Sequence, residues 1–204
     1  DNVGVLITEE PYNQDNMVLV IDIGTNGELI LGNRDKLISS SCATGPAFEG
    51  AEIKYGMRAA LGAIEKIRID PDTKEVCFRV IGKEGWNTDL EGVGAKGICG
   101  SGIIDAVAQL FMAGIINRTG RFRADLGTPR LRVTEDGPEF VIAWASETST
   151  KQDIVVCQQD IRNIQLAKGA MYAGVKIMMH RLHVEELDKI ILAGAFGSYI
   201  DKES

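Results

Sequence analysis

The sequence predicts an α/β fold in which a mixed sheet starts with three antiparallel strands and is flanked by helices. Three short apolar runs follow one another near the start, two later stretches repeat apolar residues at helical spacing, and one more apolar run lies near the end. The expected order is β-β-β, helix, further strands, long helix, strand. This order differs from the strict β-α-β alternation of a doubly wound dinucleotide-binding fold.

The first part of the chain predicts a helix end followed by a hairpin and a third strand. Residues 1–16 are expected to hold the tail of a helix and a polar connector. Residues 17–22 form a buried strand and 28–31 its hairpin partner, with a type I′ turn around Asn26-Gly27. A third strand, rich in small residues, is expected within 36–45.

The middle of the chain predicts a loop with a short helical stretch over 46–70 and a strand over 75–82. A helix with apolar positions Ile103, Val107 and Leu110 follows, capped by Ser101 and ended by Gly114.

Short strands and turns are expected over 117–157, as a small β-rich insertion. A long helix follows from residue 158, with Asp160 in its first turn where the helix dipole favours an acid. A strand and a glycine-rich turn end the chain. We expect residues 17–204 to form one lobe, as a piece of a longer protein, because the chain lacks an initial Met.

Composition excludes several classes of function. The net charge of −7 and pI near 5.0, without a Lys/Arg block, argue against nucleic acid or an anionic membrane surface as the main partner. No apolar run approaches the roughly 18 residues that a bilayer requires, and the start does not resemble a signal peptide. We expect a cytoplasmic protein.

The four cysteines, Cys42, Cys77, Cys99 and Cys157, form no C-x-x-C pair. The two histidines, His180 and His183, are not near them in the sequence, so the spacing fits neither a zinc site nor an iron–sulfur cluster. Reduced, isolated thiols are expected.

The run VLVIDIGTNGELILG contains an acid at the end of a buried strand, Asp22, followed by Gly24, Thr25, Asn26 and Gly27. An acid at a strand end can hold a hydrated divalent cation, and the glycines bring backbone amides toward an anion. The hydroxyl and amide side chains can donate to phosphate oxygens. The run therefore predicts a phosphate clamp with Mg²⁺ at Asp22, and a plain hairpin is the alternative.

Two further glycine-rich segments could approach a ligand. The segment LAGAFG places Gly194, Ala195, Phe196 and Gly197 after a strand, where small residues let a planar group lie against the backbone, and a simple turn is the alternative. Gly100 and Ser101 begin a helix and could hold an anion, or could only permit close helix–strand packing. Neither segment has the G-x-G-x-x-G or Walker pattern.

The motifs together resemble one half of an actin-like (ASKHA) ATPase, with a ribonuclease H-like fold. The runs LVIDIGTNGELILGN, GPAFEGA, GICGSGIIDAV, QDIRNIQLAKGA and ILAGAFGSYID are similar to the C-terminal part of the ferredoxin-containing reductive activators of corrinoid proteins. The resemblance covers nearly the whole chain from about residue 17 to 201.

The resemblance implies an ATP-driven redox helper. A [2Fe–2S] domain outside this chain would supply an electron, and ATP turnover would drive the reduction of Co(II) to Co(I) in the corrinoid protein of a methyltransferase. Asp22 would organise Mg²⁺ or the attacking water, residues 24–27 would hold the phosphates, and residues 194–197 would flank the adenosine. Gln165 and Lys168 are weaker candidates for the base or ribose.

Some features of the family's pattern do not occur in this sequence. There is no four-Cys cluster and no upstream D-x-G-T-T phosphate loop, and Cys157-Gln158 stands where relatives have Thr-Gln. Two alternatives stay open: a small-molecule kinase with Glu49 as its catalytic acid, and a non-catalytic lobe that docks a corrinoid protein or forms a homodimer.

Overall fold

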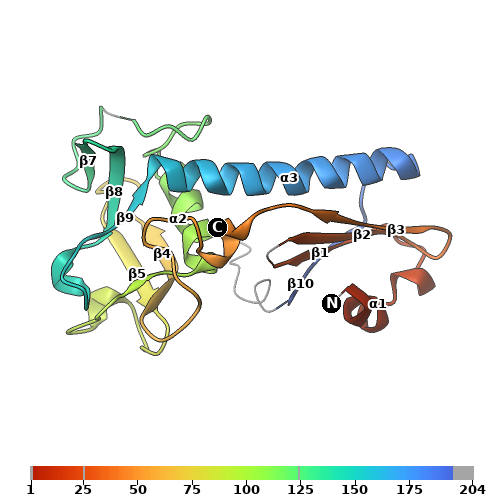
Figure 1. Ribbon diagram of the computed structural model, residues 1–204, viewed down its shortest axis with the longest axis horizontal. Helices are drawn as coiled ribbons and strands as arrows, with labels where there is room; N and C mark the ends of the chain where they lie inside the picture. The colour runs from red at the N-terminus through yellow and green to blue at the C-terminus, as the bar shows by residue number, and fades with distance from the viewer. Residues whose placement is uncertain (1, 25, 124, 195–204) are drawn as a thin grey trace. The chain divides into compact units, whose positions relative to one another are not determined.

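The structure is a computed structural model, and it describes residues 2–24, 26–123 and 125–194 (Figure 1). The chain divides into two compact units. Unit 1 comprises Asp1–Pro46 and Leu166–Tyr199, and unit 2 comprises Ala47–Gln165 and Ile200–Ser204. Each unit is described by itself below.

Unit 1 is built on a four-stranded sheet with the order β10-β1-β2-β3. The strands are β1 (Val18–Ile23), β2 (Gly27–Gly32), β3 (Leu37–Cys42) and β10 (Lys189–Ala193). β1, β2 and β3 pair antiparallel in sequence order, and β10 joins β1 in parallel. The three antiparallel strands and the late strand are those that the apolar runs predict.

Two helices cover the two faces of this sheet. Helix α3 (Gln158–Leu182) buries Met178 and Met179 against Leu19, Leu29 and Leu31. Helix α1 (Asn2–Glu9) places Val5 and Leu6 against the other face, which is formed by Val18, Val20 and Ile30. Because side chains alternate along a strand, both faces of the central strands β1 and β2 are apolar. A short 3₁₀ turn, η1 (Pro11–Asn13), connects α1 to the sheet.

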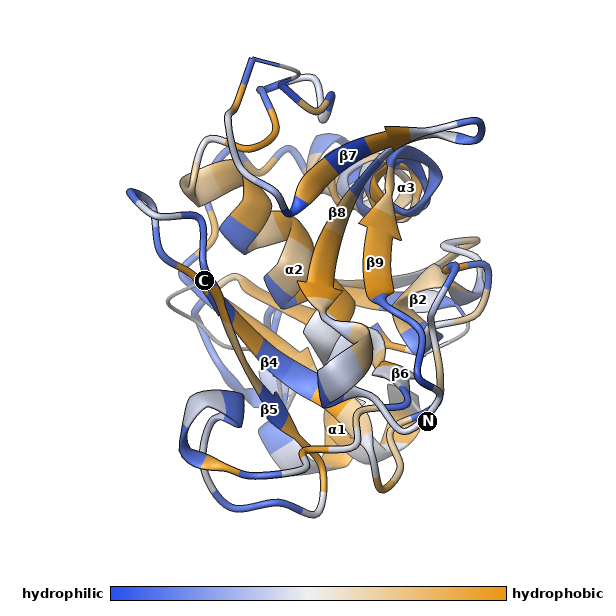
Figure 2. Ribbon diagram, turned by 90° about the vertical axis from the view of Figure 1, so that its left-hand side faces the viewer, coloured by the Kyte–Doolittle hydropathy of each residue, from blue (hydrophilic) through white to orange (hydrophobic). Residues whose placement is uncertain are grey.

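Unit 2 contains two three-stranded sheets. In the first, with the order β5-β4-β6, β4 (Ala63–Ile69) pairs antiparallel with β5 (Val76–Val80) and parallel with β6 (Gly97–Ile98). In the second, with the order β7-β8-β9, β7 (Leu131–Thr134), β8 (Gly137–Ala143) and β9 (Ile154–Cys157) are antiparallel. Figure 2 shows β8 and β9 as strongly hydrophobic. The fully buried Phe78 and Phe140 mark the core.

Helix α2 (Gly100–Met112) packs on β4, and short 3₁₀ turns complete the unit: η2 (Pro46–Glu49), whose first residue belongs to unit 1, η3 (Asn87–Asp89) and η4 (Ala145–Glu147). Gly114 follows the C-terminal cap of α2 with φ 67°, so the predicted end of this helix is confirmed. The cap at its start is Cys99, and the prediction of Ser101 is wrong. Ser101 lies inside the first turn and its hydroxyl donates to the carbonyl of Glu65 at 3.2 Å.

Two other local predictions are wrong. The helical stretch expected within 46–70 is absent, because Ala63–Ile69 pairs with β5 and lies under α2. Tertiary pairing overrides the helical propensity of this segment. The type I′ turn around Asn26-Gly27 is also wrong, since Gly27 already pairs with Ile23 and three residues separate the two strands.

The predicted long helix is confirmed as α3, and its start has an unexpected cap. The carboxylate of Asp160 is buried and accepts hydrogen bonds from the backbone N–H groups of Cys157 and Lys54, both at 2.9 Å. The acid at the third helical position therefore makes one of the two hydrogen bonds of a capping box, and Cys157 has no hydroxyl to make the other.

Candidate functional site

Asp22 lies near the end of β1, opposite Glu28 of β2 and Ala193 of β10. Since side chains alternate along β1, its carboxylate is on the same face of the sheet as Val18 and Val20. The side chain is half-buried, and among the described residues no donor forms a hydrogen bond or ion pair with it. Asp22 is thus an acid at the margin of an apolar face.

Glu28 is a second acid at this position, and sequence reasoning missed it. It faces Asp22 directly across the β1–β2 pair, and its Oε1 accepts a hydrogen bond from the hydroxyl of Ser41 at 2.9 Å. Like charges placed directly opposite each other on a sheet destabilise it. The signal that could have revealed Glu28 is the register, because a turn of three residues pairs position 22 with position 28.

Gly194 approaches the carboxylate of Asp22. Its φ of 83° lies in the left-handed region that L side chains rarely adopt, and a Cβ built on it would overlap Oδ1 of Asp22. The carboxyl ends of the parallel strands β1 and β10 meet at the same edge of the sheet, which brings the two segments together. The structure therefore places the start of the second glycine-rich segment beside the acid of the first.

The loop between β1 and β2 turns tightly at this edge. The N–H of Gly24 donates to the carbonyl of Asn26 at 3.0 Å, and the side chain of Asn26 is exposed. Gly27 is buried, and a Cβ there would lie 3.0 Å from Met171 and 3.1 Å from Thr44. Packing under α3 thus already accounts for Gly27. Thr25, Ala195, Phe196 and Gly197 lie outside the described residues.

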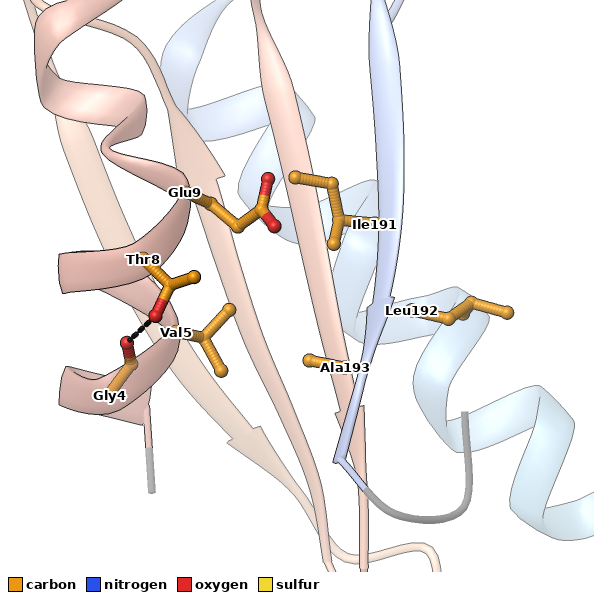
Figure 3. Close-up of a pocket in the computed structure, with 7 residues that line it drawn as sticks. All are labelled: Gly4, Val5, Thr8, Glu9, Ile191, Leu192 and Ala193. Atoms are coloured by element: carbon orange, nitrogen blue, oxygen red, sulfur yellow. Dashed lines mark hydrogen bonds between the residues drawn. The ribbon is translucent and has the colours of Figure 1, made fainter. Parts of the chain in front are cut away.

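A shallow pocket lies on the same face of the sheet, between α1 and β10 (Figure 3). Its walls include Val5, Ile191 and Ala193. Its polar groups are already bound, since the Thr8 hydroxyl donates to the carbonyl of Gly4 at 2.9 Å and Glu9 accepts from Lys189 at 3.4 Å. None of the site residues predicted from the sequence lines this pocket.

Lys168 is the other predicted residue of unit 1, and its side chain is exposed on α3. The remaining predicted residues belong to unit 2. Glu49 is exposed at the end of η2. Gln165 contacts the 117–120 turn, where its amide donates to the carbonyl of Thr119 at 3.2 Å.

The start of α2 is closely packed. Gly100 and Ser101 are buried, and a Cβ on Gly102 would overlap the carbonyl of Ile64. Gly102 therefore has a packing role against β4. Anion binding at Gly100 and Ser101 stays a prediction.

Cys42 is the cysteine at this end of the sheet, since it lies opposite Gly27 in the β2–β3 pair. Cys42 and Cys99 are buried, and Cys77 and Cys157 are half-buried, all four as free thiols. Burial raises the pKa of the Cys42 thiol, and the nearby Glu28 carboxylate raises it further. Within the described ranges no group of three or more His, Cys, Asp or Glu side chains could hold a metal. In the same residues no helix is long and apolar enough to cross a membrane.

Comparison with known proteins identifies the family. A family model described as the C-terminal domain of RACo, the ASKHA domain, matches residues 16–204. The chain belongs to this family. The resemblance read from the motifs and the actin-like fold class are both confirmed.

Relatives of this ASKHA domain carry names that refer to corrinoid proteins. The chain is 40% identical over 194 residues to the corrinoid activation enzyme RamQ of Eubacterium limosum, covering 91% of this chain and 31% of RamQ. It is 27% identical over 219 residues to the [Co(II) methylated amine-specific corrinoid protein] reductase of Methanosarcina barkeri, covering 100% of this chain and 36% of that protein.

A solved structure resembles the same domain. It is described as a reductive activator for a corrinoid, iron–sulfur protein, with a TM-score of 0.84 and 43% identity over 96% of this chain and 30% of that chain. The ASKHA domain described here therefore spans about a third of the length of these relatives.

Proposed function

We propose that this chain is the ATP-binding lobe of a reductive activator that drives Co(II) to Co(I) in the corrinoid protein of a methyltransferase. The electron would come from a [2Fe–2S] domain outside this chain. The observation that carries the proposal is the approach of Gly194 to the Asp22 carboxylate. The names of the relatives support the class of substrate.

The residues at the end of β1 and β10 fit a nucleotide with Mg²⁺. Asp22 offers carboxylate oxygens that no described residue occupies, and a cation held by one carboxylate, phosphates and waters is a common arrangement for Mg²⁺. Gly194 has no side chain where one would fill the space beside Asp22, so a ligand can reach that carboxylate along the backbone.

Each residue has a defined part in this proposal. Asp22 would hold Mg²⁺ or orient the attacking water, and the backbone at Gly24 with the exposed amide of Asn26 would face the β- and γ-phosphates. Gly194 would flank the adenosine. Bound Mg²⁺ neutralises charge on the transferred phosphoryl group, so positioning and electrostatics supply the catalytic effect.

The test is a titration of Mg·ATP into the full-length protein by calorimetry, with Asp22→Ala and Gly194→Ala as variants. Asp22→Ala removes the contact with the ion, and Gly194→Ala obstructs the space beside Asp22. We therefore expect both variants to bind Mg·ATP at least about tenfold more weakly. Glu49→Ala, on an exposed turn of unit 2, tests the kinase alternative, because a kinase would require that acid and the proposed function does not.

The reduction of the corrinoid protein is monitored through the loss of its Co(II) absorbance. The proposal requires that Asp22→Ala abolish ATP-dependent reduction while the [2Fe–2S] centre is still reduced normally. It is wrong if the wild-type protein fails to bind Mg·ATP, or if Asp22→Ala supports reduction at the wild-type rate.

A further inference from the structure

Helix α3 carries apolar and small residues on the face that points away from the sheet of unit 1. Met178 and Met179 are buried against the sheet, whereas Leu166 is 66% exposed and Ile177 is 61% exposed. Between residues 166 and 177, at about 100° per residue, one stripe of about 100° contains five residues. These are Leu166, Gly169, Ala170, Ala173 and Ile177, referred to below as the outer stripe.

The two glycines of α3 differ in what surrounds them. At Gly174 a Cβ would overlap the sulfur of Cys42 and lie 2.9 Å from Leu29, so close packing requires a glycine. At Gly169 no atom lies within 4 Å of the position of a Cβ. Glycine inside a helix is less stable than alanine. Nothing among the described residues explains Gly169, whereas a partner that approaches the outer stripe closely would.

The charges beside the outer stripe are positive. Lys176, His180 and Arg181 are exposed, and in the described part of the chain neither Lys176 nor Arg181 forms an ion pair. Residues 161–184 contain no Asp or Glu, and the first acid after α3 is Glu185. α3 has four Lys/Arg and one Asp, a charge of +3 in a chain of −7, so the rest of the chain carries −10.

This pattern decides which kind of partner fits. A second copy would bring two basic helix faces together, and residues 161–184 hold no acid that could pair with them. An acidic surface with apolar side chains at helical spacing complements both the charge and the outer stripe. Asp22 and Glu28 lie on the opposite face of the sheet, so such a partner would leave the nucleotide site open.

We propose that the outer stripe of α3 is the docking surface for an acidic, apolar-lined helix of the corrinoid protein, an inference that rests on the proposed function. Leu166 and Ile177 are the apolar anchors, Gly169 permits close approach of the partner's backbone, and Lys176 and Arg181 steer its acidic side chains.

The test measures binding of the purified corrinoid protein to the full-length activator by biolayer interferometry at two salt concentrations. The double variant Leu166→Ala/Ile177→Ala is expected to bind at least about tenfold more weakly. Gly169→Leu, which puts a bulky side chain into the open space, is expected to do the same. Lys176→Glu/Arg181→Glu is expected to lower the association rate at low salt, and to reduce its salt dependence.

The matched control is Val3→Ala. Val3 is 66% exposed, as Leu166 is, but lies on α1 and not on α3, so binding is expected to stay within twofold of the wild type. Circular dichroism melting of each variant verifies the fold, and Gly169→Leu is expected to melt no lower than the wild type.

The outcomes separate this inference from the proposed function. If the wild-type protein binds and reduces the corrinoid protein and the outer-stripe variants do so equally well, the docking surface is wrong and the proposed function stands. If the wild-type protein neither binds nor reduces it, both proposals fail. If light scattering shows a dimer that Gly169→Leu dissociates, a second copy covers the outer stripe and the inference is overturned.

Discussion

Glu139 of unit 2 and the facing pair Asp22 and Glu28 of unit 1 lie in opposite electrostatic surroundings. In unit 2 Glu139 is 3% exposed and is held by Lys54 at 2.9 Å and by Arg132 at 2.8 Å. In unit 1 Asp22 and Glu28 face each other with no cation beside them among the described residues. Removing the charge of a buried, paired acid destabilises a fold because its partners lose their counter-charge, whereas two facing acids without a cation reduce stability.

Glu139→Gln is expected to give the largest effect on stability. The amide keeps the shape but leaves Lys54 without its counter-charge and Arg132 with Asp153 alone, and both are partly exposed, so we expect a loss of about 2 kcal/mol. Urea unfolding at pH 7 measures the change. A loss below about 0.5 kcal/mol would mean that the pairing in unit 2 is as weak as an ordinary surface pair.

The pH dependence of unit 2 follows from the same acid. Burial raises the pKa of Glu139, but hydrogen bonds from Lys54 and Arg132 outweigh it and leave the pKa below its usual value of 4.5. The unfolded chain therefore takes up the proton first as the pH falls. The stabilisation is complete well above pH 4.5 and decreases as the pH falls below it.

The measurement is the difference in unfolding free energy between wild type and Glu139→Gln at several pH values. We expect this difference to shrink as the pH falls below 4.5. A constant difference would show that the charge of Glu139 does not contribute.

Asp22→Asn tests unit 1 and is expected to change stability in the opposite direction. Removal of one of two facing carboxylates relieves repulsion, so we expect a gain of about 0.2–1 kcal/mol, together with loss of Mg·ATP binding. Thermal melting without nucleotide measures it, and Glu28→Gln is the matched control. A loss of stability of more than about 1 kcal/mol in Asp22→Asn would show that Asp22 is a structural acid like Glu139.

Ser41→Ala is expected to have the smallest effect. Its hydroxyl donates to Glu28 from an exposed position, so removal should cost no more than about 0.5 kcal/mol. Urea unfolding at pH 7 is again the measurement, and a large loss would show that Glu28 is stabilised by its strand neighbours.

The sequence predicts most of unit 1, because β1, β2 and β10 have apolar runs, β3 is a short segment rich in small residues, and α3 has a clear helical period. It fails at Ala63–Ile69, where a segment with helical composition pairs with β5 instead. It also fails at Ser101, because a hydroxyl near a helix start can cap the helix or, as here, bind a carbonyl of the neighbouring strand.

The candidate site is predicted in part. Asp22 and Gly194 stand out as an acid and a glycine at strand ends, and the structure brings them together. Glu28 does not stand out, since its place opposite Asp22 depends on the length of the turn. The Asp160 cap involves Lys54, which is 106 residues away, so no local pattern could reveal it.

The close packing of Gly174 on Cys42 makes this thiol a chemical reporter. Cys42 is 8% exposed, and the backbone of α3 covers its sulfur because Gly174 has no side chain. An alkylating reagent can therefore reach the thiol only when the helix separates locally from β3. The rate at which iodoacetamide modifies Cys42, measured by peptide mass spectrometry, would report how often α3 separates locally from β3.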